Sequence, residues 1–308
     1  MTTSAGEVPV TYRRATPEDW RAAHKVFRYS VFDLEFRLGQ EENNTPPTDE
    51  ALQADWDRRR DLYEHLAMSS DNFWVAERDG EVIGFARSIR RGHLRELTEF
   101  FVLPGMQSGG VGAELLRRAF PEEPGVYHGI IATVDVRAQS RYIKSGMFPR
   151  FIFYSLSRAP EPRPPHPDLV ALPLTNSAEM IAALATLDEL VLGHRRDVDH
   201  QWLISTRQGF LYSLHGQVIG YGYVGEYSGP FAVVDPQFVP IVLEHAENEA
   251  ARQGRANFAL EIPMVNQAAL AHLLGRGYKI DPFYCYFMAD AVFGQFDRYV
   301  ALSPNLLL

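Results

Sequence analysis

The glycine-rich turn in residues 97–120, LTEFFVLPGMQSGGVGAELLRRAF, is the segment best suited to binding a ligand. An apolar run rich in Phe and Val reaches Pro104, and an amphipathic helical pattern starts near Gly112. Glycines at such a turn let backbone N–H groups share one space, and the helix N-terminus adds partial positive charge. We therefore expect a pyrophosphate here, and the alternative is a tight turn with only a structural role. The loop contains neither Gly-Lys-Ser/Thr nor G-x-G-x-x-G, which excludes the common nucleotide loops.

Two motifs resemble those of a known family. Residues 107–112, QSGGVG, resemble the Gln/Arg-x-x-Gly-x-Gly/Ala acyl-CoA loop of the GCN5-related N-acetyltransferases. Residues 138–148, AQSRYIKSGMF, resemble the family's closing helix, where a tyrosine follows an alanine by four residues and a Gly-hydrophobic pair comes next. Asp135 stands where an asparagine is common in that family. The resemblance covers residues 10–157 well and 168–290 in outline, in the manner of tandem members of the superfamily.

The resemblance implies that the chain binds acetyl-CoA as a co-substrate. The pyrophosphate would lie on the backbone amides of residues 110–113, and the pantetheine arm would pair with residues 101–103 as an added strand. Ser140 and Arg141 would reach the phosphates or the adenosine, although an arginine on a helix surface is more often simply solvated. The expected cofactor-binding residues are Phe101, Val102, Leu103, Gln107, Ser108, Gly109, Gly110, Val111, Gly112, Ala113, Ser140 and Arg141.

Acetyl transfer to an amine requires a group that takes a proton and a group that gives one. Tyr142 holds the position of the family's general acid, four residues before Gly146, and the alternative is a core side chain. Glu99 and Glu96 lie on the strand before the loop, where family members often carry a glutamate. Glu99 is the preferred base because it interrupts an apolar run, but Glu96, a water chain or a merely solvated carboxylate remain open. No metal is expected.

The order of secondary-structure signals is the same in the two halves of the chain. Each half begins with a short strand and a capped helix, followed by a hairpin around Asp79-Gly80 or His215-Gly216. Each then has a helix, a strand and a short helix ending in glycine, and we expect the terminal strands to close each half. We interpret this as a duplication of an α/β (α+β) domain, giving two tandem GNAT-like domains. Each would be a mixed, mostly antiparallel twisted sheet flanked by helices.

The two copies are joined by a proline-rich segment and differ in their chemistry. We expect a catalytic N-terminal domain over residues 1–157, an extended linker over 158–173 and a C-terminal domain over 174–308. The second copy has Phe238 and Pro240 in place of the glycine loop, and Leu273 stands in place of the tyrosine. We therefore expect a degenerate copy with a structural or substrate-shaping role.

Composition limits the compartment and the partners. The 308 residues carry a net charge of −9, which argues against nucleic-acid binding through the overall field. No apolar stretch approaches the length that spans a membrane. The single cysteine, Cys285, excludes an internal disulfide framework and suits a reducing cytoplasm, and we expect this residue to be buried. The excess of arginine over lysine suggests a bacterial source. The oligomeric state is open.

These observations predict an N-acetyltransferase that acts on a primary amine of a small molecule or peptide, by direct transfer in a ternary complex. The alternatives are a non-catalytic acyl-CoA sensor or scaffold, and a transferase of the same fold that uses another acyl donor. An acidic stretch between residues 33 and 50 would favour a cationic amine, or is a solvated loop. The polar run Gly193–His200 is expected to be a surface loop, because its histidines have no familiar metal-ligand spacing.

Overall fold

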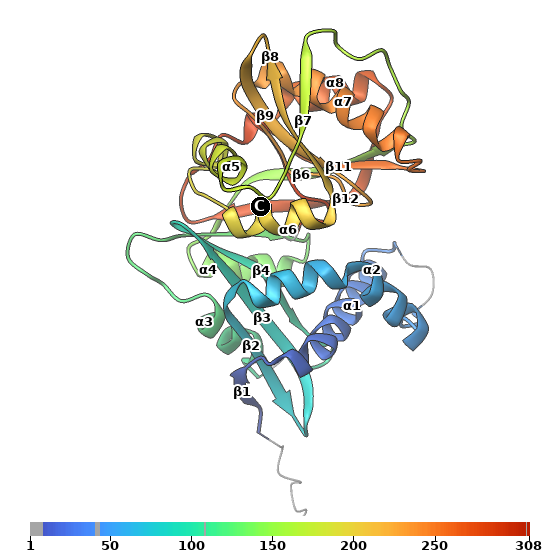
Figure 1. Cartoon of the computed structure of the whole chain (residues 1–308). Coiled ribbons are helices and arrows are strands. Elements are labelled where there is room, and N and C mark those ends of the chain that lie inside the picture. Colours follow the sequence, from blue (N-terminus) through green and yellow to red (C-terminus); the bar gives the residue numbers. More distant parts are fainter. Residues whose placement is uncertain (1–8, 41–43, 108, 306) are drawn as a thin grey trace, which may run out of the picture. The chain divides into compact units, whose positions relative to one another are not determined.

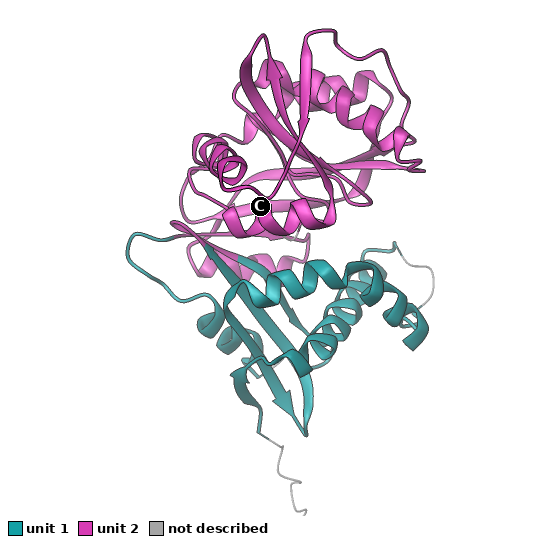
Figure 2. Ribbon diagram, viewed as in Figure 1, with its two compact units in different colours: residues 1–90, 97–126 teal, residues 91–96, 127–308 magenta. Residues whose placement is uncertain are grey.

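The structure is a computed structural model of the chain, and it describes residues 9–40, 44–107, 109–305 and 307–308. These residues form two compact units (Figure 2). Unit 1 contains the described residues within 1–90 and 97–126, and unit 2 contains those within 91–96 and 127–308. Among the described residues, no helix is both long and apolar enough to cross a membrane.

Unit 1 is built on the antiparallel strands β1, β2, β3 and β4, which are hydrogen-bonded in that order (Figure 1). The tip of the β3–β4 hairpin belongs to unit 2. Asp79 and Gly80 connect β2 to β3, and both have positive φ, which confirms the predicted Asp-Gly turn. The bounds are β1 (Thr11–Arg14), α1 (Trp20–Arg37), α2 (Asp49–Met68), β2 (Ser70–Arg78), β3 (Glu81–Arg91), β4 (Leu94–Val102) and α3 (Val111–Ala119).

The helices of unit 1 begin at polar caps and bury their apolar faces. Thr16 and Asp19 form a capping box at the short turn that precedes α1, where the sequence predicts a capped helix. The Thr48 hydroxyl accepts the Ala51 N–H at the start of α2. Helix α3 packs on β2 and buries Leu115 completely. Strands β3 and β4 are therefore held in a packed layer up to the loop that follows β4.

Unit 2 contains two groups of strands and the remaining helices. The first residues of β4 pair in parallel with β5, and the order continues β5-β12-β6-β11. A second sheet has the order β13-β10-β9-β8-β7. The bounds are β5 (Tyr127–Ala132), α4 (Val136–Lys144), β6 (Phe148–Arg158), β7 (Leu169–Pro173), α5 (Ala178–Val191), α6 (Asp197–Thr206), β8 (Gln208–Leu214), β9 (Gln217–Val224), β10 (Phe231–Val233), α7 (Val239–Arg252), β11 (Phe258–Pro263), α8 (Gln267–Gly275), β12 (Lys279–Ala289) and β13 (Tyr299–Val300).

The strands that end the two halves of the chain are exchanged between them. Strand β12, from the second half, lies between β5 and β6 and pairs antiparallel with both. Strand β6, from the first half, pairs on its other side with β11 of the second half. The expectation that each half is closed by its own terminal strand is therefore wrong. Backbone hydrogen bonds do not depend on sequence, so the strand pattern alone could not select the partner.

The proline-rich segment is bound to unit 2 along part of its length. Its last residues, Leu169–Pro173, form β7 at the edge of the second sheet. The Arg163 N–H donates to the side-chain oxygen of Asn248 on α7 at 2.8 Å, and the Asn248 amide donates to the Arg163 carbonyl at 2.9 Å. The Glu161 N–H donates to the buried Glu247 carboxylate at 2.9 Å. The last five residues of the segment form a strand, and its earlier part is hydrogen-bonded to α7.

Candidate functional site

The loop between β4 and α3 has the backbone geometry that the sequence predicts. Gly109 and Gly110 have φ angles of 82° and 84°, in the left-handed region that glycine adopts without strain. Apart from its chain neighbours, no heavy atom of the described residues lies within 4 Å of a Cβ built on either glycine. Gly110 is the N-cap of α3, and Gly112 is buried inside the first turn. Ser108, the remaining polar residue of the motif, lies outside the described residues.

The first turn of α3 presents backbone donors to the space beside this loop. The N–H groups of Val111, Gly112 and Ala113 have no acceptor within the helix, because the first turn lacks preceding carbonyls. The first helical hydrogen bond runs from the Glu114 N–H to the Gly110 carbonyl at 3.0 Å. These donors and the helix dipole favour an anion.

Glu114 is an acidic group in the first turn, and its charge is compensated locally. Its carboxylate lies 2.7 Å from Arg117 and 2.6 Å from Arg118. Hydrogen bonds from these two guanidinium groups lower the pKa of Glu114 to about 2. The carboxylate is thus ionised and paired, so it opposes a bound phosphate less than a free carboxylate would.

The end of β4 offers one residue for pairing with an added strand. The Leu103 N–H donates to the Ile83 carbonyl of β3 at 2.9 Å, and the Leu103 carbonyl accepts the Met106 N–H at 3.0 Å. Backbone groups of successive strand residues point to opposite neighbours. Phe101 and Leu103 therefore face β3, and Val102 presents its backbone to the other side. Of the three residues expected to pair with pantetheine, only Val102 has this orientation.

Gln107 connects the loop to the end of the strand. Its side-chain amide donates to the Val102 carbonyl at 3.2 Å, and the Ser30 hydroxyl of α1 donates to the same carbonyl at 3.3 Å. Both bonds are near the long end of the usual range, so an incoming donor can displace them at small cost. The structure thus brings Gln107 and Val102 into direct contact within unit 1.

Glu99 is buried in an ion pair that the sequence did not reveal. Its side chain is 3% exposed, and its carboxylate contacts the guanidinium of Arg87 on β3. Arg87 also donates to the Tyr63 carbonyl of α2 at 3.1 Å and lies over the ring of Phe73. Arg87 therefore places a cationic group against the buried Glu99 carboxylate.

Glu96 is also buried, with 2% exposure, and it belongs to unit 2. Both of its carboxylate oxygens accept the backbone N–H of Leu308, at 3.1 and 3.2 Å. Burial raises the pKa of Glu96 to about 8. The Glu96 carboxylate is therefore hydrogen-bonded to the backbone N–H of Leu308, whereas the Glu99 carboxylate is paired with the Arg87 guanidinium.

The expected acid and two expected phosphate ligands lie on α4 in unit 2. The Asp135 carboxylate caps this helix by accepting the Arg137 N–H at 2.9 Å. Tyr142 is only 3% exposed, and burial raises the pKa of its phenol well above the usual value, so the phenol keeps its proton. The Ser140 hydroxyl donates to the carbonyl one turn earlier in the helix, at 2.6 Å, and Arg141 is half-buried.

The run Gly193–His200 is not a surface loop. Arg196, Asp199 and His200 are all buried, and the run enters α6 at Asp197. Asp188 of α5 accepts hydrogen bonds from Arg196 at 2.9 Å and from His200 at 2.9 Å. His194 is buried in the same run, and its desolvation lowers the pKa of the imidazole to about 4.

Tyrosines complete this polar network in the core of unit 2. The Tyr223 hydroxyl lies 2.8 Å from His200, and the Tyr221 and Tyr299 hydroxyls lie 2.7 and 2.9 Å from Arg196. A signal was available, because Asp188 interrupts the apolar face of α5. Tyr221 and Tyr223, two apart on one strand, also share a face. The charged members of the network are paired with one another, so we assign the network a structural role in the core of unit 2.

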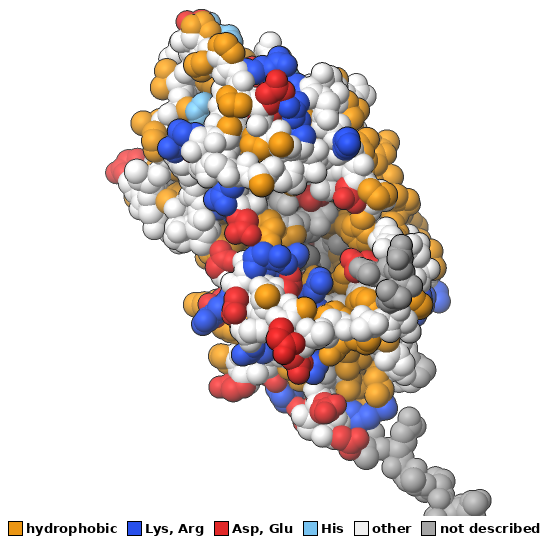
Figure 3. Space-filling model, turned by 90° about the vertical axis from the view of Figure 1, so that its right-hand side faces the viewer, with side chains coloured by type: hydrophobic (Ala, Val, Ile, Leu, Met, Phe, Trp, Pro, Cys, Tyr) orange, Lys and Arg blue, Asp and Glu red, His pale blue; other side chains and the backbone are white. Residues whose placement is uncertain are grey.

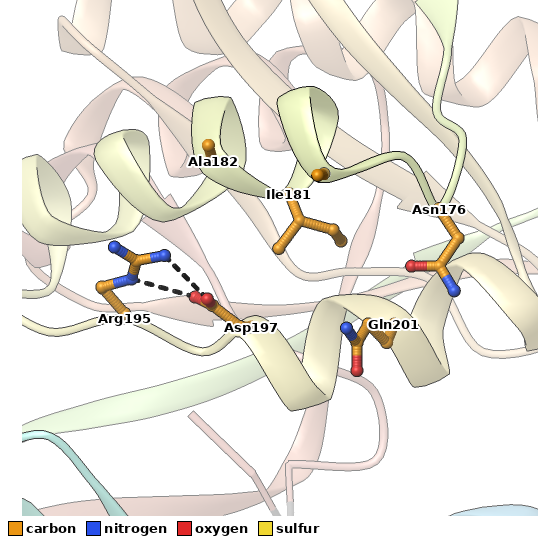
Figure 4. Close-up of a pocket in the computed structure, with 7 residues that line it drawn as sticks. Asn176, Ile181, Ala182, Arg195, Asp197 and Gln201 are labelled. Carbon is orange, nitrogen blue, oxygen red and sulfur yellow. Dashed lines mark hydrogen bonds and ion pairs between the residues drawn. The ribbon is translucent and has the colours of Figure 1, made fainter.

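A pocket of about 420 Å³ lies between α5 and α6 in unit 2 (Figure 4). Its two charged side chains, Arg195 and Asp197, pair with each other at 2.7 Å, and both are substantially exposed. The remaining lining residues are Asn176, Ala178, Ile181, Ala182 and Gln201. Because Arg195 and Asp197 neutralise each other, we assign no ligand to this pocket.

Charges of both signs are mixed on the face of the molecule shown in Figure 3, where acidic and basic side chains lie among apolar ones. The net charge of −9 does not gather into a single acidic field on that face. Cys285 is buried, as predicted, and burial raises the pKa of its thiol to about 12, which makes it a poor nucleophile.

A comparison with protein families matches the segment that contains the loop. The family model described as the acetyltransferase (GNAT) domain matches residues 69–146, from the end of α2 to just beyond α4. A search of the curated proteins finds no match to this sequence.

Solved structures share the fold over nearly the whole chain. A Pyrococcus horikoshii protein proposed to be an acetyltransferase has a TM-score of 0.69 and 17% identity, covering 97% of this chain and 96% of its own. A GCN5-related N-acetyltransferase from Sphaerobacter thermophilus has a TM-score of 0.57 and 15% identity, covering 92% and 96%. A tandem GNAT protein from the clavulanic acid biosynthesis pathway has a TM-score of 0.56 and 11% identity, covering 92% and 98%. At these identities the likeness concerns the fold.

Proposed function

We propose that this chain, a member of the GNAT superfamily with the fold of tandem GNAT proteins, transfers an acetyl group from acetyl-CoA to a primary amine. The fold supports acyl transfer from a CoA-linked donor. The observation that carries the proposal is the loop before α3, where two left-handed glycines open a helix N-terminus inside the segment that matches the GNAT domain.

In the proposed complex, the pyrophosphate lies on the N–H groups of residues 110–113. Residues 101–103 hold the pantetheine arm, and the backbone of Val102 supplies the pairing after Gln107 releases its carbonyl. Ser140 and Arg141 on α4 complete the phosphate and adenosine side. The glycine geometry, the first-turn donors that have no acceptor within the helix, and the compensated charge of Glu114 support this arrangement.

The proposed reaction is direct transfer in a ternary complex. The neutral amine nitrogen attacks the thioester carbonyl carbon, the C–N bond forms, and the C–S bond then breaks. Tyr142 donates its phenolic proton to the departing CoA thiolate, and the proton lost by the amine leaves through a base or a water chain. The phenol carries its proton at neutral pH, as an unperturbed tyrosine also does, and burial makes it a weaker acid, so the proposed role rests on the place of Tyr142 in the motif.

We propose Glu99 as the base, acting from its ion pair with Arg87. Glu96 is the weaker candidate because both of its oxygens already accept the Leu308 N–H. The acceptor is a small-molecule or peptide amine, and the reaction takes place in a reducing cytoplasm, which suits a single buried cysteine.

We further propose that residues 1–157 are the catalytic copy, 158–173 the connecting segment and 174–308 a copy that has lost donor binding. Before α7, which corresponds to α3, the Asp235 carboxylate accepts the Gln237 N–H at 2.9 Å. A carboxylate at this helix start disfavours a phosphate there. Leu273, in the position that corresponds to Tyr142, is buried in the core.

The loop assignment is tested by Gly110→Glu, with Gly80→Glu as its matched control. Both glycines are exposed, have positive φ and have no atom within 4 Å of a built Cβ, so the two variants carry the same strain and charge. We expect Gly110→Glu to weaken CoA binding about a hundredfold or more, because it places charge and bulk against the phosphates. Gly80→Glu should bind CoA like the wild type. Calorimetric titration that gives equal affinities for both variants would contradict the assignment.

Catalysis itself is tested by thiol release from acetyl-CoA across a panel of amines, which we expect to reveal at least one acceptor. CoA binding without thiol release on any amine would favour the sensor or scaffold. Thiol release that occurs only with a different acyl-CoA would show that this compound, and not acetyl-CoA, is the donor.

A further inference from the structure

The tip of the β3–β4 hairpin is held by residues of the second half of the chain. Residues Arg91–Glu96 group with unit 2, although the rest of both strands belongs to unit 1. The same strand β4 continues from Glu96 to Glu99 and Val102, where the donor site is proposed. The contacts of this tip can therefore influence the part of β4 that lies next to the proposed reaction site.

A buried bidentate ion pair is the strongest of these contacts. The Arg91 guanidinium donates to Asp199 of α6 through Nε at 2.6 Å and through Nη2 at 2.7 Å. Both side chains are buried. A two-point bond between a planar guanidinium and a carboxylate defines orientation as well as distance.

Two further contacts restrain the same six residues. Gly92 has a φ of 55°, and a Cβ built on it would lie 3.0 Å from the Cβ of His194, just before α6. Glu96 accepts the Leu308 N–H, and it pairs in register with Gly129 of β5. The tip is therefore held at its first, second and last residues.

We infer that Asp199 is a positioning residue for acyl transfer, which sets the place of β4 through its ion pair with Arg91. This inference rests on the acyl-CoA site proposed above. A strand advances about 3.3 Å per residue and is stiff along its length, so a shift of the tip is passed on to Glu99 and Val102. The loop at Gly110 depends instead on the packing of α3 against β2, within unit 1.

This difference yields a specific expectation for binding. Loss of the ion pair should weaken the contacts of β4 with the thioester and pantetheine, and should leave the pyrophosphate loop unchanged. The probes are CoA and 3′-phosphoadenosine 5′-diphosphate, which is the CoA headgroup without pantetheine.

The test compares Asp199→Asn with Asp197→Asn in the full chain. Asp197 lies on the same helix, and its ion pair with Arg195 is exposed, so the control makes the same chemical change and leaves the Arg91–Asp199 ion pair in place. For Asp199→Asn we expect kcat to fall about tenfold to a hundredfold, as small misplacements of reacting groups do. The affinity for CoA should fall toward that for the headgroup, while headgroup affinity stays unchanged. Asp197→Asn should match the wild type in all three measurements.

A second variant separates positioning from stability. Arg91→Met combined with Asp199→Leu replaces the buried pair by apolar side chains, which restores stability in many proteins. We expect Tm to return toward the wild-type value while the losses in kcat and in the pantetheine contribution persist. If activity and CoA affinity recover together with Tm, the pair is merely structural and the inference fails.

A readout independent of activity distinguishes failure of this inference from failure of the proposed function. Backbone hydrogen exchange of the peptide covering residues 94–103 should be faster in Asp199→Asn than in Asp197→Asn. Equal exchange in the two variants overturns the inference, whatever the enzyme does. If the wild type neither binds CoA nor releases thiol, the proposed function fails, and the exchange result still decides whether Asp199 holds β4.

Discussion

Tyr142 and Glu99 are both buried, but burial affects their ionisable groups differently because their neighbours differ. Desolvation, with a smaller contribution from the Asp135 charge, raises the pKa of the Tyr142 phenol, so the phenol keeps its proton. Glu99 is equally buried, yet a guanidinium compensates its charge. Two side chains of similar exposure therefore differ in their electrostatic surroundings.

Removal of the phenol oxygen tests the acid role. We expect Tyr142→Phe to lower kcat about a hundredfold and to leave CoA affinity unchanged, because the ring still fills its site. Since burial raises the pKa of Tyr142, the loss should be the same at every pH from about 6 to about 9. Tyr212→Phe, which removes an equally buried phenol from the second half, is the control. Unchanged turnover in Tyr142→Phe would contradict the acid role.

At the scale of elements, the docked segment after β6 shows how a proline-rich connection becomes part of a unit. Glu247 of α7 is buried, accepts the Glu161 N–H and pairs with Arg276 at 2.8 Å. Arg276 in turn donates to the Glu161 carbonyl at 2.9 Å. A segment without regular structure of its own thus has its backbone groups satisfied by a buried ion pair.

Replacement of Glu247 should release this segment. Glu247→Ala leaves Arg276 buried without its counter-charge, and we expect a loss of about 3 kcal/mol in the free energy of unfolding. Cleavage by a protease of broad specificity, mapped by mass spectrometry, should increase between residues 159 and 168. Glu244→Ala, one turn earlier on α7, changes a partly exposed carboxylate and should alter neither measurement. Equal cleavage of both variants would show that Glu247 does not hold the segment.

At the scale of the whole chain, the strand exchange makes the two halves depend on each other. Without β12, strands β5 and β6 would lose the partner that lies between them. Leu156 of β6 is fully buried in a core formed mainly by residues of the second half. The boundaries at 157 and 174 therefore describe the repeated sequence pattern, while the compact units cut across it.

Separation of the halves should therefore abolish folding. We expect a fragment of residues 1–158 to aggregate when expressed alone, because unpaired strand edges and apolar residues of β6 become exposed. Co-expression with residues 159–308 should restore a soluble complex. A fragment that by itself unfolds cooperatively, followed by circular dichroism, would show that the exchange is dispensable.

The sequence by itself determined the local backbone conformation. Thr16, the Asp79-Gly80 turn and the glycines of the loop have conformations that depend on near neighbours, so each was predictable from its own segment. The repeated order of elements and the buried Cys285 followed from hydrophobic pattern and residue type in the same way.

Tertiary structure alone decided which distant groups meet. The ion pairs Arg87–Glu99 and Arg91–Asp199 are buried. From its own segment alone, each of these four residues would be predicted to lie in solvent. The strand exchange was likewise invisible, because any strand offers the same backbone donors and acceptors to every partner. Burial and partner choice are properties of the packed chain, and here they determine which carboxylates are paired and which strand completes each sheet.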